Sequence, residues 1–420
     1  MPGVTTTAAT CPSCGTGTTA LREAAPWCPG CEWNLDAYDP ARRKREFAWG
    51  RLDRWAHRLA VGQFARLSAR GLDDSGSPVA RIVTMAVSVL LLAGVLALAA
   101  TGVWLLVAFP FPNLSMLLGV VLLALAYALR PRFGRLDEHL TVLDRDRAPE
   151  LFALVDEVAA AAGTPAPHVL AVDGTLNAYA GTVGVRRRRV LCLGLPLWGA
   201  LPAGERVALL GHELGHFANG DPRRAPLVQP ALTMLGSAAD LVRPVGTVSG
   251  AGLLELVGLA LAHAVQAVLA RVLLASQLVL VAVALRDSQR AEYLADEMAA
   301  RVAGTDAATG MLDALLAQES IALAVRRESR AGHGPDRWRA AVADARLAAA
   351  DRLPLVRQLS VRDEVTLFAE HPPTGLRQRL LASRPRHEPL VVLTEQRRTR
   401  IDAELAAEYE KVRRAVSWAA

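Results

Sequence analysis

The longest apolar run of the chain extends from Ile82 to Leu129, and its 48 residues include no Asp, Glu, Lys, Arg or His. A helix that spans a bilayer needs about 20 apolar residues, so this run is long enough for two spans. Pro110, Pro112 and Asn113 interrupt the run near its middle and are typical of a tight turn. The pattern predicts a transmembrane hairpin over residues 82–129, because a soluble core does not require so long an uncharged sequence.

A second apolar region covers residues 226–285 and is most hydrophobic between Ala251 and Leu285. One helix over those 35 residues would be roughly 52 Å long, which exceeds one ordinary span. Either two short spans meet near Arg271, or the first span starts earlier, among residues 227–250. We favour a second hairpin. The alternative is a pair of helices that lie against the membrane surface or against the soluble part of the chain.

The remaining sequence has the mixed polar and apolar pattern of a soluble domain. From Ala203 onward the pattern is almost entirely helical, whereas β-rich runs precede it. The expected strands cover residues 168–172, 177–183 and 190–193, with Arg186 to Arg189 in a solvated loop or edge. The expected fold is mostly α, of the α+β class: a helical domain with a small β-sheet, combined with two transmembrane hairpins.

The composition agrees with a membrane protein. The 420 residues are 52% hydrophobic and 21% charged, which excludes a disordered chain. The formal net charge of +6 rests almost wholly on arginine, since lysine occurs only at positions 44 and 411. Residues 41–81 contain ten Lys or Arg and four Asp or Glu, and they predict a basic, partly helical linker. A nucleic-acid-binding arm is a less favoured interpretation, and we do not expect a nucleic-acid partner.

The charges that flank the first predicted hairpin indicate its orientation. Arg81 precedes the first span, Arg130, Arg132 and Arg135 follow the second, and the turn between the spans is uncharged. The positive-inside rule therefore places both flanks in the cytoplasm. No secretory signal is recognisable at the start of the chain. We expect a multi-pass protein of the cytoplasmic membrane, with its soluble domain and both termini in the cytoplasm.

Four of the five cysteines lie within residues 1–40, as two pairs, Cys11-x2-Cys14 and Cys28-x2-Cys31. Two thiolates separated by two residues can bind one metal ion from a tight turn, and two such turns complete a closed tetrahedral site. We expect a small zinc ribbon whose structural metal stabilises the module. Disulfides or a redox pair are alternatives, and the pattern does not distinguish zinc from iron.

A second motif, His212-Glu213-Leu-Gly-His216, follows a predicted helix start. Residues at i and i+4 share one helix face, so both imidazoles can bind one Zn²⁺. Glu213 comes beside the open position of the metal, where its carboxylate can take a proton from the attacking water and pass it to a leaving amine. The motif indicates a catalytic zinc site, and the alternative is a helix with two ordinary histidines.

A catalytic zinc site needs a third protein ligand. In one class of zinc peptidase a histidine six residues after the motif supplies it, but position 222 is proline, which excludes that class. Glu292 and Asp296 lie four residues apart in a predicted helix. Glu292 can bind zinc while Asp296 accepts the free ring N–H of a ligand histidine. Taken alone, such an acidic pair is more typical of a solvated helix face.

The two segments together resemble the HtpX-type membrane zinc metallopeptidases, which are relatives of the CAAX prenyl proteases. The resemblance rests on His212-Glu-Leu-Gly-His216 followed, after an apolar interruption, by Glu292-Tyr-Leu-Ala-Asp296. It implies a membrane-bound, zinc-dependent endopeptidase whose substrates are misfolded or damaged membrane proteins. The zinc ribbon and the basic linker are not part of the usual layout of that family. A protein partner of the ribbon therefore stays an open expectation.

The resemblance also implies roles for three other segments. Asn177-Ala178-Tyr-Ala resembles the family's Asn-Ala-Phe-Ala segment, an edge strand that would pair with an extended substrate. The sequence Asn219-Gly-Asp would close the helix of the zinc motif. His371-Pro-Pro-Thr-Gly-Leu-Arg377 resembles the family's His-Pro…Arg element, whose two side chains would face the scissile carbonyl and stabilise the oxyanion. From the residues alone, Asn177 could be an ordinary turn residue and His371 an ordinary turn cap.

These expectations combine into one domain order. The order is a zinc ribbon (1–40), a basic linker (41–81), a transmembrane hairpin (82–129), the first part of the catalytic domain (130–225), a second membrane-associated hairpin (226–285) and the second part of the catalytic domain (286–420). One alternative is a specialised processing protease of the CAAX type, which the small number of spans disfavours. Another is an inactive membrane scaffold that binds through its ribbon, and the intact Glu213 argues against it.

Overall fold

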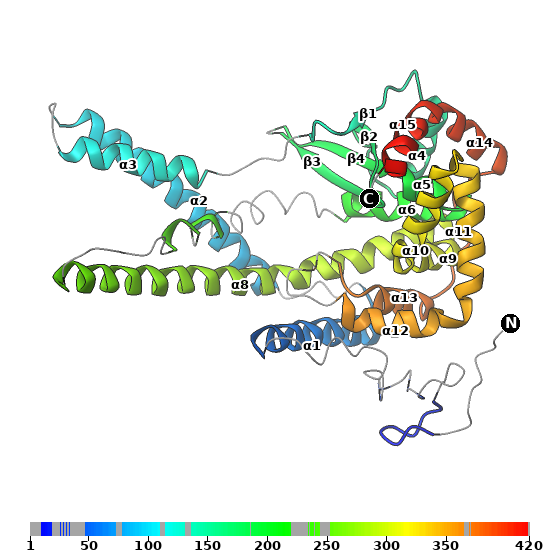
Figure 1. Ribbon diagram of the computed structural model, residues 1–420, viewed down its shortest axis with the longest axis horizontal. Coiled ribbons are helices and arrows are strands. Elements are labelled where there is room, and N and C mark those ends of the chain that lie inside the picture. The colour runs from blue at the N-terminus through cyan, green and yellow to red at the C-terminus, as the bar shows by residue number, and fades with distance from the viewer. Residues whose placement is uncertain are drawn as a thin grey trace. The chain divides into compact units, whose positions relative to one another are not determined.

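A computed structural model describes most of the chain and divides it into two units. The described residues are 10–18, 26, 28, 31, 33, 47–72, 78–109, 114–130, 136–184, 186–219, 234, 236–238, 240–243, 253–364, 369 and 371–418. Unit 1 consists of residues 1–74, 135–221 and 288–420, and unit 2 consists of residues 75–134 and 222–287. The mostly helical fold with a small sheet that the sequence predicts is confirmed (Figure 1).

Unit 1 contains a four-stranded sheet in the order β1-β2-β4-β3. The strands are β1 (Thr141–Val142), β2 (Val169–Asp173), β3 (Ala178–Val183) and β4 (Arg188–Gly194). β2 and β4 are parallel, and the outer strands pair with them antiparallel. All three predicted strands are present, whereas β1 was missed because two residues carry no periodicity. Of the predicted loop or edge at 186–189, Arg186 and Arg187 lie in the turn before β4, and Arg188 and Arg189 begin the strand.

The antiparallel edge strand β3 is held against β4 by a close backbone contact at Gly194. A Cβ atom at this glycine would lie 2.1 Å from the Thr175 carbonyl oxygen and 2.4 Å from that of Asn177. The Gly194 N–H donates to the Asn177 oxygen at 2.8 Å. Only glycine allows this approach, so the loop that leads into the edge strand is fixed by the last residue of β4.

The helices of unit 1 enclose a large apolar core and smaller apolar clusters beside it. Its largest buried side chains are Trp198 and Trp338, which are 0% exposed, and Arg206, also 0% exposed, pairs with Asp402 at 2.7 Å. The helices are α1 (Phe47–Arg70), α4 (Pro149–Ala161), α5 (Leu195–Ala200), α6 (Ala203–Ala218), the later part of α8 (Leu253–Ala303), α9 (Thr305–Leu316), α10 (Gln318–Arg330), α11 (Pro335–Ala349), the 3-10 turn η3 (Ala350–Arg352), α12 (Leu353–Asp363), α13 (Thr374–Ala382), α14 (Glu395–Glu404) and α15 (Ala406–Trp418). This core supports the two helices that carry the zinc motif and its expected third ligand.

In unit 2, α2 (Pro78–Val107) and α3 (Leu114–Ala128) lie side by side (Figure 1). They approach closely at two glycines, since a Cβ at Gly119 would lie 2.9 Å from the Gly102 carbonyl oxygen. Away from this contact the surface is apolar: Leu90 and Leu96 are each 71% exposed and Val107 is 81% exposed. The predicted turn at 110–113 lies outside the described residues. Two closely packed helices with an apolar outer surface fit a lipid environment better than water.

Within the described residues, one helix, Met85–Val107, is long and apolar enough to cross a membrane by itself. α3 is apolar but shorter, with 15 residues. The helices α9 and α10 pass the same test only as a pair bent by 78°. Their inner faces, including Met311, Leu312 and Ile321, belong to the apolar core of unit 1, so this pair is a core element.

The second apolar region differs from the expectation in one respect. α8 is one continuous helix of 51 residues, Leu253–Ala303, so the alternative of two short spans that meet near Arg271 is wrong (Figure 1). Its sequence contains no proline and a single glycine, Gly258, and nothing in it interrupts the backbone hydrogen bonds. A second hairpin would therefore need a first arm before Leu253. Of residues 226–252, only 234, 236–238 and 240–243 are described, and the hairpin stays a prediction.

Candidate active site

The histidine motif lies on α6 with both imidazoles on one face, as the i, i+4 spacing requires. The Nε2 atoms of His212 and His216 are 3.3 Å apart, and their rings meet edge to face. The helix ends at Ala218, and the N–H of Asn219 donates to the Gly215 carbonyl at 2.9 Å. Asn219 thus closes the helix as expected, while residues 220 and 221 lie outside the described part of the chain.

Two glycines bring α6 against α8. A Cβ at Gly211 would lie 3.1 Å from the Cα of Ala299, and one at Gly215 would lie 3.1 Å from the Cα of Ala295. Such distances leave no room for larger side chains, so the two helix backbones touch along one turn. The sequence analysis did not identify these glycines, although their four-residue spacing around the histidine motif was a readable signal.

The close contact places Glu292 of α8 beside both histidines. Its Oε2 atom is 3.5 Å from His212 Nε2, and its Oε1 atom is 3.4 Å from His216 Nε2. Ligands at about 2.0–2.1 Å from a tetrahedral zinc ion are separated by about 3.3–3.4 Å. The donor types and their spacing therefore fit a zinc ion with three protein ligands and one open position.

Asp296 lies behind His212 and fixes its orientation. Its Oδ1 atom is 3.0 Å from His212 Nδ1, which leaves Nε2 directed at Glu292 and His216. Burial would raise the pKa of the Asp296 carboxyl, but the charge and hydrogen bonds of Arg377, followed by His212, hold that pKa below its usual value. A carboxylate that stays ionised can accept the ring N–H and select the tautomer that a metal needs.

Arg377 lies deep within the site, against Asp296 and His212. Its side chain is 3% exposed and donates two hydrogen bonds to Asp296, at 2.7 and 2.8 Å. Its Nη2 atom also lies 3.4 Å from His212 Nδ1, 3.5 Å from His212 Nε2 and 3.7 Å from Glu292 Oε2. A buried guanidinium engaged by a carboxylate orients that carboxylate. Arg377 therefore orients Asp296 at the site, and its expected role toward the scissile carbonyl stays a prediction.

His371 lies at the exposed edge of the site. Its Nδ1 atom is 2.6 Å from Glu292 Oε2, while 53% of its side chain is exposed. The loop residue 371 precedes α13, which carries Arg377, so one short segment supplies both side chains. Unlike Arg377, His371 is open to solvent and can meet a bound molecule.

Glu213 is buried beside the metal ligands. In the sequence of α6 it lies between the two histidines, and it is 7% exposed. Burial raises the pKa of its carboxyl, and the nearby His212 and His216 oppose this change. A raised pKa makes the carboxylate a stronger base, which favours a role in proton transfer.

Asn177 and Ala178 stand at the start of the edge strand β3. Ala178 pairs with Leu193, and Tyr179 pairs with Cys192 on β4. The other edge of β3 pairs with no strand among the described residues, and Tyr179 is 39% exposed. An unpaired strand edge presents backbone N–H and C=O groups that can bind an extended peptide.

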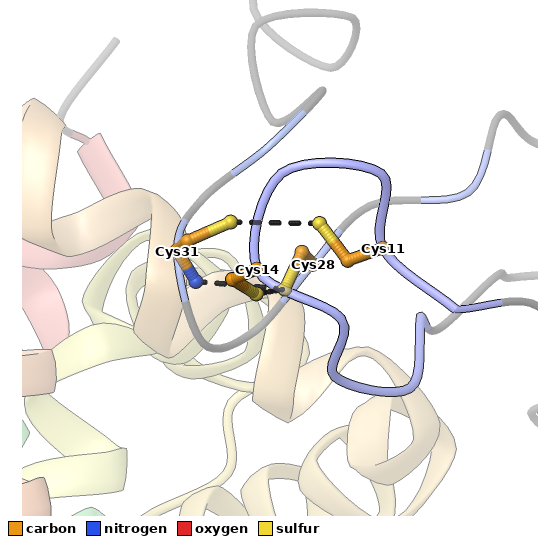
Figure 2. Close-up of side chains that lie close together, drawn as sticks. All are labelled: Cys11, Cys14, Cys28 and Cys31. Carbon is orange, nitrogen blue, oxygen red and sulfur yellow. Dashed lines mark hydrogen bonds between the residues drawn. The ribbon is translucent and has the colours of Figure 1, made fainter.

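A second group of potential ligands comprises the four N-terminal cysteines. Figure 2 shows their sulfur atoms close together, with Cys11 Sγ 3.6 Å from Cys31 Sγ and Cys14 Sγ 3.5 Å from Cys28 Sγ. These distances exceed the roughly 2.05 Å of a disulfide and approach the roughly 3.8 Å between sulfurs around a tetrahedral zinc ion. The arrangement is that of a closed zinc-ribbon-like cluster without an open position.

Comparisons with known proteins agree with the geometry of the histidine site. The model of the family described as Peptidase family M48 matches residues 145–384. The chain belongs to peptidase family M48. A protease HtpX homolog of Syntrophobacter fumaroxidans is 30% identical over 250 residues, which cover 56% of this chain and 76% of the relative. Another, of Methanothermobacter thermautotrophicus, is 33% identical over 111 residues, or 26% of this chain and 43% of the relative. No solved structure matches the chain.

This M48 peptidase is thus an HtpX-like metallopeptidase, and the resemblance that the sequence motifs suggest is confirmed. The matched residues 145–384 include α6, α8 and the loop that carries His371. The cysteine cluster and the helices α1, α2 and α3 lie outside the match. Family membership therefore supports the assignment of the catalytic unit. The role of the N-terminal third of the chain has to be argued from the contacts that its residues make.

Proposed function

We propose that this M48 peptidase is a zinc-dependent endopeptidase of the cytoplasmic membrane that cuts exposed segments of misfolded or damaged membrane proteins. The observation that carries the proposal is the convergence of His212, His216 and Glu292, whose donor atoms lie 3.3–3.5 Å apart. Two imidazoles and one carboxylate are the ligand set of many catalytic zinc ions, which keep one position open for water or substrate.

The chemistry follows from the residues around that open position. Zinc bound by the three side chains would act as a Lewis acid that polarises the scissile carbonyl and acidifies water. Glu213 takes the proton of the attacking water and donates it to the leaving amine, so one carboxyl serves as base and then as acid. Asp296 holds the Nδ1 proton of His212, and Arg377 keeps Asp296 in place. Burial of Glu213 supports this role because it raises the pKa of the base.

We assign substrate binding to the two exposed features of the site. The free edge of β3, beginning at Asn177 and Ala178, would add an extended peptide as a further antiparallel strand. His371, which is half-exposed and adjacent to Glu292, would donate a hydrogen bond to the carbonyl oxygen of the scissile bond. Such binding selects extended or unfolded segments, because most backbone N–H and C=O groups of a folded protein are already hydrogen-bonded.

We place the protein in the membrane through α2 and α3, with α8 and the residues before it as a second membrane-associated pair. The apolar surface of α2 and the uncharged run 82–129 support this placement. The arginines on both flanks favour a cytoplasmic catalytic unit and cytoplasmic termini. Reporter tags fused before Met1 and after Ala420 should both report the cytoplasm, and an external C-terminus would contradict the topology. The expected partners are the lipid bilayer and protein substrates, with a possible protein partner for the cysteine module.

The catalytic proposal is tested by cleavage of an unfolded protein, and of the chain itself, in mild detergent with zinc. Wild type and Glu213→Gln are compared at equal zinc content, because the variant keeps all three ligands. General acid–base catalysis contributes about 10²–10⁴-fold, so the variant should lose at least that factor. Equal activity of the two proteins would contradict the proposal. Cleavage restricted to lipidated peptides would indicate a specialised processing protease instead.

A further inference from the structure

Helix α1 has a buried face, although the sequence analysis treats its residues as part of a linker. Ala56, Ala60 and Leu67 are 2%, 2% and 4% exposed, and their spacing of four and seven residues puts them on one side of the helix. Leu72, just after the helix, is also 4% exposed. A helix in a flexible linker would be exposed on all sides. α1 is therefore a docked part of unit 1.

The buried face packs against the segments that carry the metal-site residues. Leu67 and Leu72 form an apolar cluster with Tyr293 and Leu380. Ala60 forms another cluster with Val361 and Leu376. Tyr293 directly follows the ligand Glu292, and Leu376 directly precedes Arg377. α1 thus contacts the immediate neighbours of two side chains of the site.

Polar contacts join α1 to the same segments. The guanidinium of Arg290, on α8 two residues before Glu292, donates to the Leu72 carbonyl oxygen at 2.8 Å. The Nδ1 atom of His57 lies 3.2 Å from the carbonyl oxygen of Val361. On α13, the guanidinium of Arg379 lies over the Phe64 ring at 5.8 Å. Apolar and polar contacts therefore both fix α1 on α8, α12 and α13.

We propose that α1 is a positioning element of the active site, which holds Glu292 and Arg377 in place through Tyr293 and Leu376. The inference rests on the proposed metal site and adds an element from outside the matched residues 145–384. The ligand Glu292 has to meet two histidines of another helix, and a displacement of about 1 Å at such a site costs on the order of 10²-fold in rate. The packing of α1 against Tyr293 of α8 and Leu376 of α13 restrains both segments.

The position of α1 in the chain gives this contact a further consequence. The cysteine module precedes α1, and α2 begins at Pro78, eight residues after α1 ends at Arg70. In chain order α1 therefore lies between the cysteine module and the first apolar helix, ahead of the matched peptidase residues. Binding of a partner by the cysteine module could therefore change catalysis through α1, without touching the substrate.

The test uses the same substitution on both faces of α1 in the full chain. Ala60→Trp places an indole between α1 and Val361 and Leu376, whereas Ala65→Trp places it at an exposed position. We measure kcat and KM on the unfolded test protein and count the zinc retained at rising chelator concentrations. Glu292→Ala, which lacks the third ligand of the catalytic site, is the reference. The zinc that wild type releases and this variant does not is the zinc of the catalytic site. This zinc measurement does not depend on activity.

We expect Ala60→Trp to lower kcat at least about tenfold with KM little changed, and to release the catalytic-site zinc at about tenfold lower chelator concentration. Ala65→Trp should match wild type in both. If Ala60→Trp does not fold, Leu67→Ala should show the same two changes in milder form. Leu67→Met, which keeps the volume of the side chain, should have wild-type values. Wild-type kcat and zinc retention in Ala60→Trp or Leu67→Ala would overturn the proposal. If wild type itself cleaves nothing, the proposed function fails, and zinc retention alone still decides the role of α1.

Discussion

The two potential metal sites differ in what holds their ligands together. At the histidine site the ligands come from two long helices that touch at Gly211 and Gly215, and Asp296 and Arg377 orient one of them from behind. At the cysteine site the ligands come from two short turns, and Cys14 and Cys31 are exposed. The first site is formed by the packing of a large core, whereas the described residues of the second belong to a short N-terminal segment, in which Cys11 and Cys28 are buried.

This difference corresponds to two functions of a bound metal ion, which are catalysis and stabilisation of the fold. A site that the fold builds can leave one coordination position open, because the ion is not needed to hold the fold together. A site in a module of about 40 residues has to use all four positions for protein ligands, because metal binding supplies the free energy of folding. The histidine site therefore suits catalysis, and the cysteine site suits structure.

The largest effect should come from removing the third ligand. We expect Glu292→Ala to reduce bound zinc from two ions per chain to one, since the cysteine cluster is intact. A metal ion contributes several kcal/mol to catalysis, so activity should fall by about 10³-fold or more. Metal analysis and cleavage assays measure both changes. Retention of two ions with full activity would disprove the ligand assignment.

The next effect should be confined to the N-terminal module. Cys28→Ser removes a sulfur that is 0% exposed, and we expect the module to lose its metal and its fold. Limited proteolysis should then cut within residues 1–40 and leave the matched region 145–384 intact. The catalytic unit should keep its single zinc ion. Loss of both ions from this variant would show that the two sites do not fold independently.

A smaller effect is expected from a substitution of Asp296, whose carboxylate contacts the ring of the ligand His212. Asp296→Asn keeps the shape of the side chain but removes the charge that pairs with Arg377. Loss of such a partner costs about 10–100-fold in metal affinity, which a chelator titration measures. Asp306→Asn is the matched control, because Asp306 pairs with Arg386 on an exposed surface. An equal, negligible effect of both substitutions would argue against the orienting role of Asp296.

The smallest effect concerns the contact between helices. In Gly215→Ala the new methyl group would lie 3.1 Å from the Cα of Ala295, and we expect a loss of roughly 1–3 kcal/mol in stability from overpacking. Gly62→Ala on α1 meets no atom within 4 Å and should be neutral or stabilising by up to about 1 kcal/mol. Thermal unfolding compares the two variants. A stabilised Gly215→Ala would show that the glycine contact does not set the helix spacing.

The sequence by itself determined the features that depend on local spacing. Residues four apart on a helix share a face whatever surrounds them, which is why His212 with His216, and Glu292 with Asp296, could be paired from the sequence. The same holds for the two cysteine pairs, whose ligands are two residues apart. The uncharged length of residues 82–129 and the short β-rich runs are likewise local properties. From these, the family and the mostly helical fold with a small sheet followed.

The tertiary structure alone decided which distant segments meet. Arg377 and Asp296 are 81 residues apart, and only the folded chain shows that the arginine pairs with this carboxylate. The docking of α1 beside Tyr293, the glycine contact between α6 and α8, and the continuity of α8 through Arg271 were also decided there. The docking of α1 and the glycine contact are set by the packing of complementary surfaces. The partner of such a surface depends on shape and burial, which periodicity along the chain does not encode.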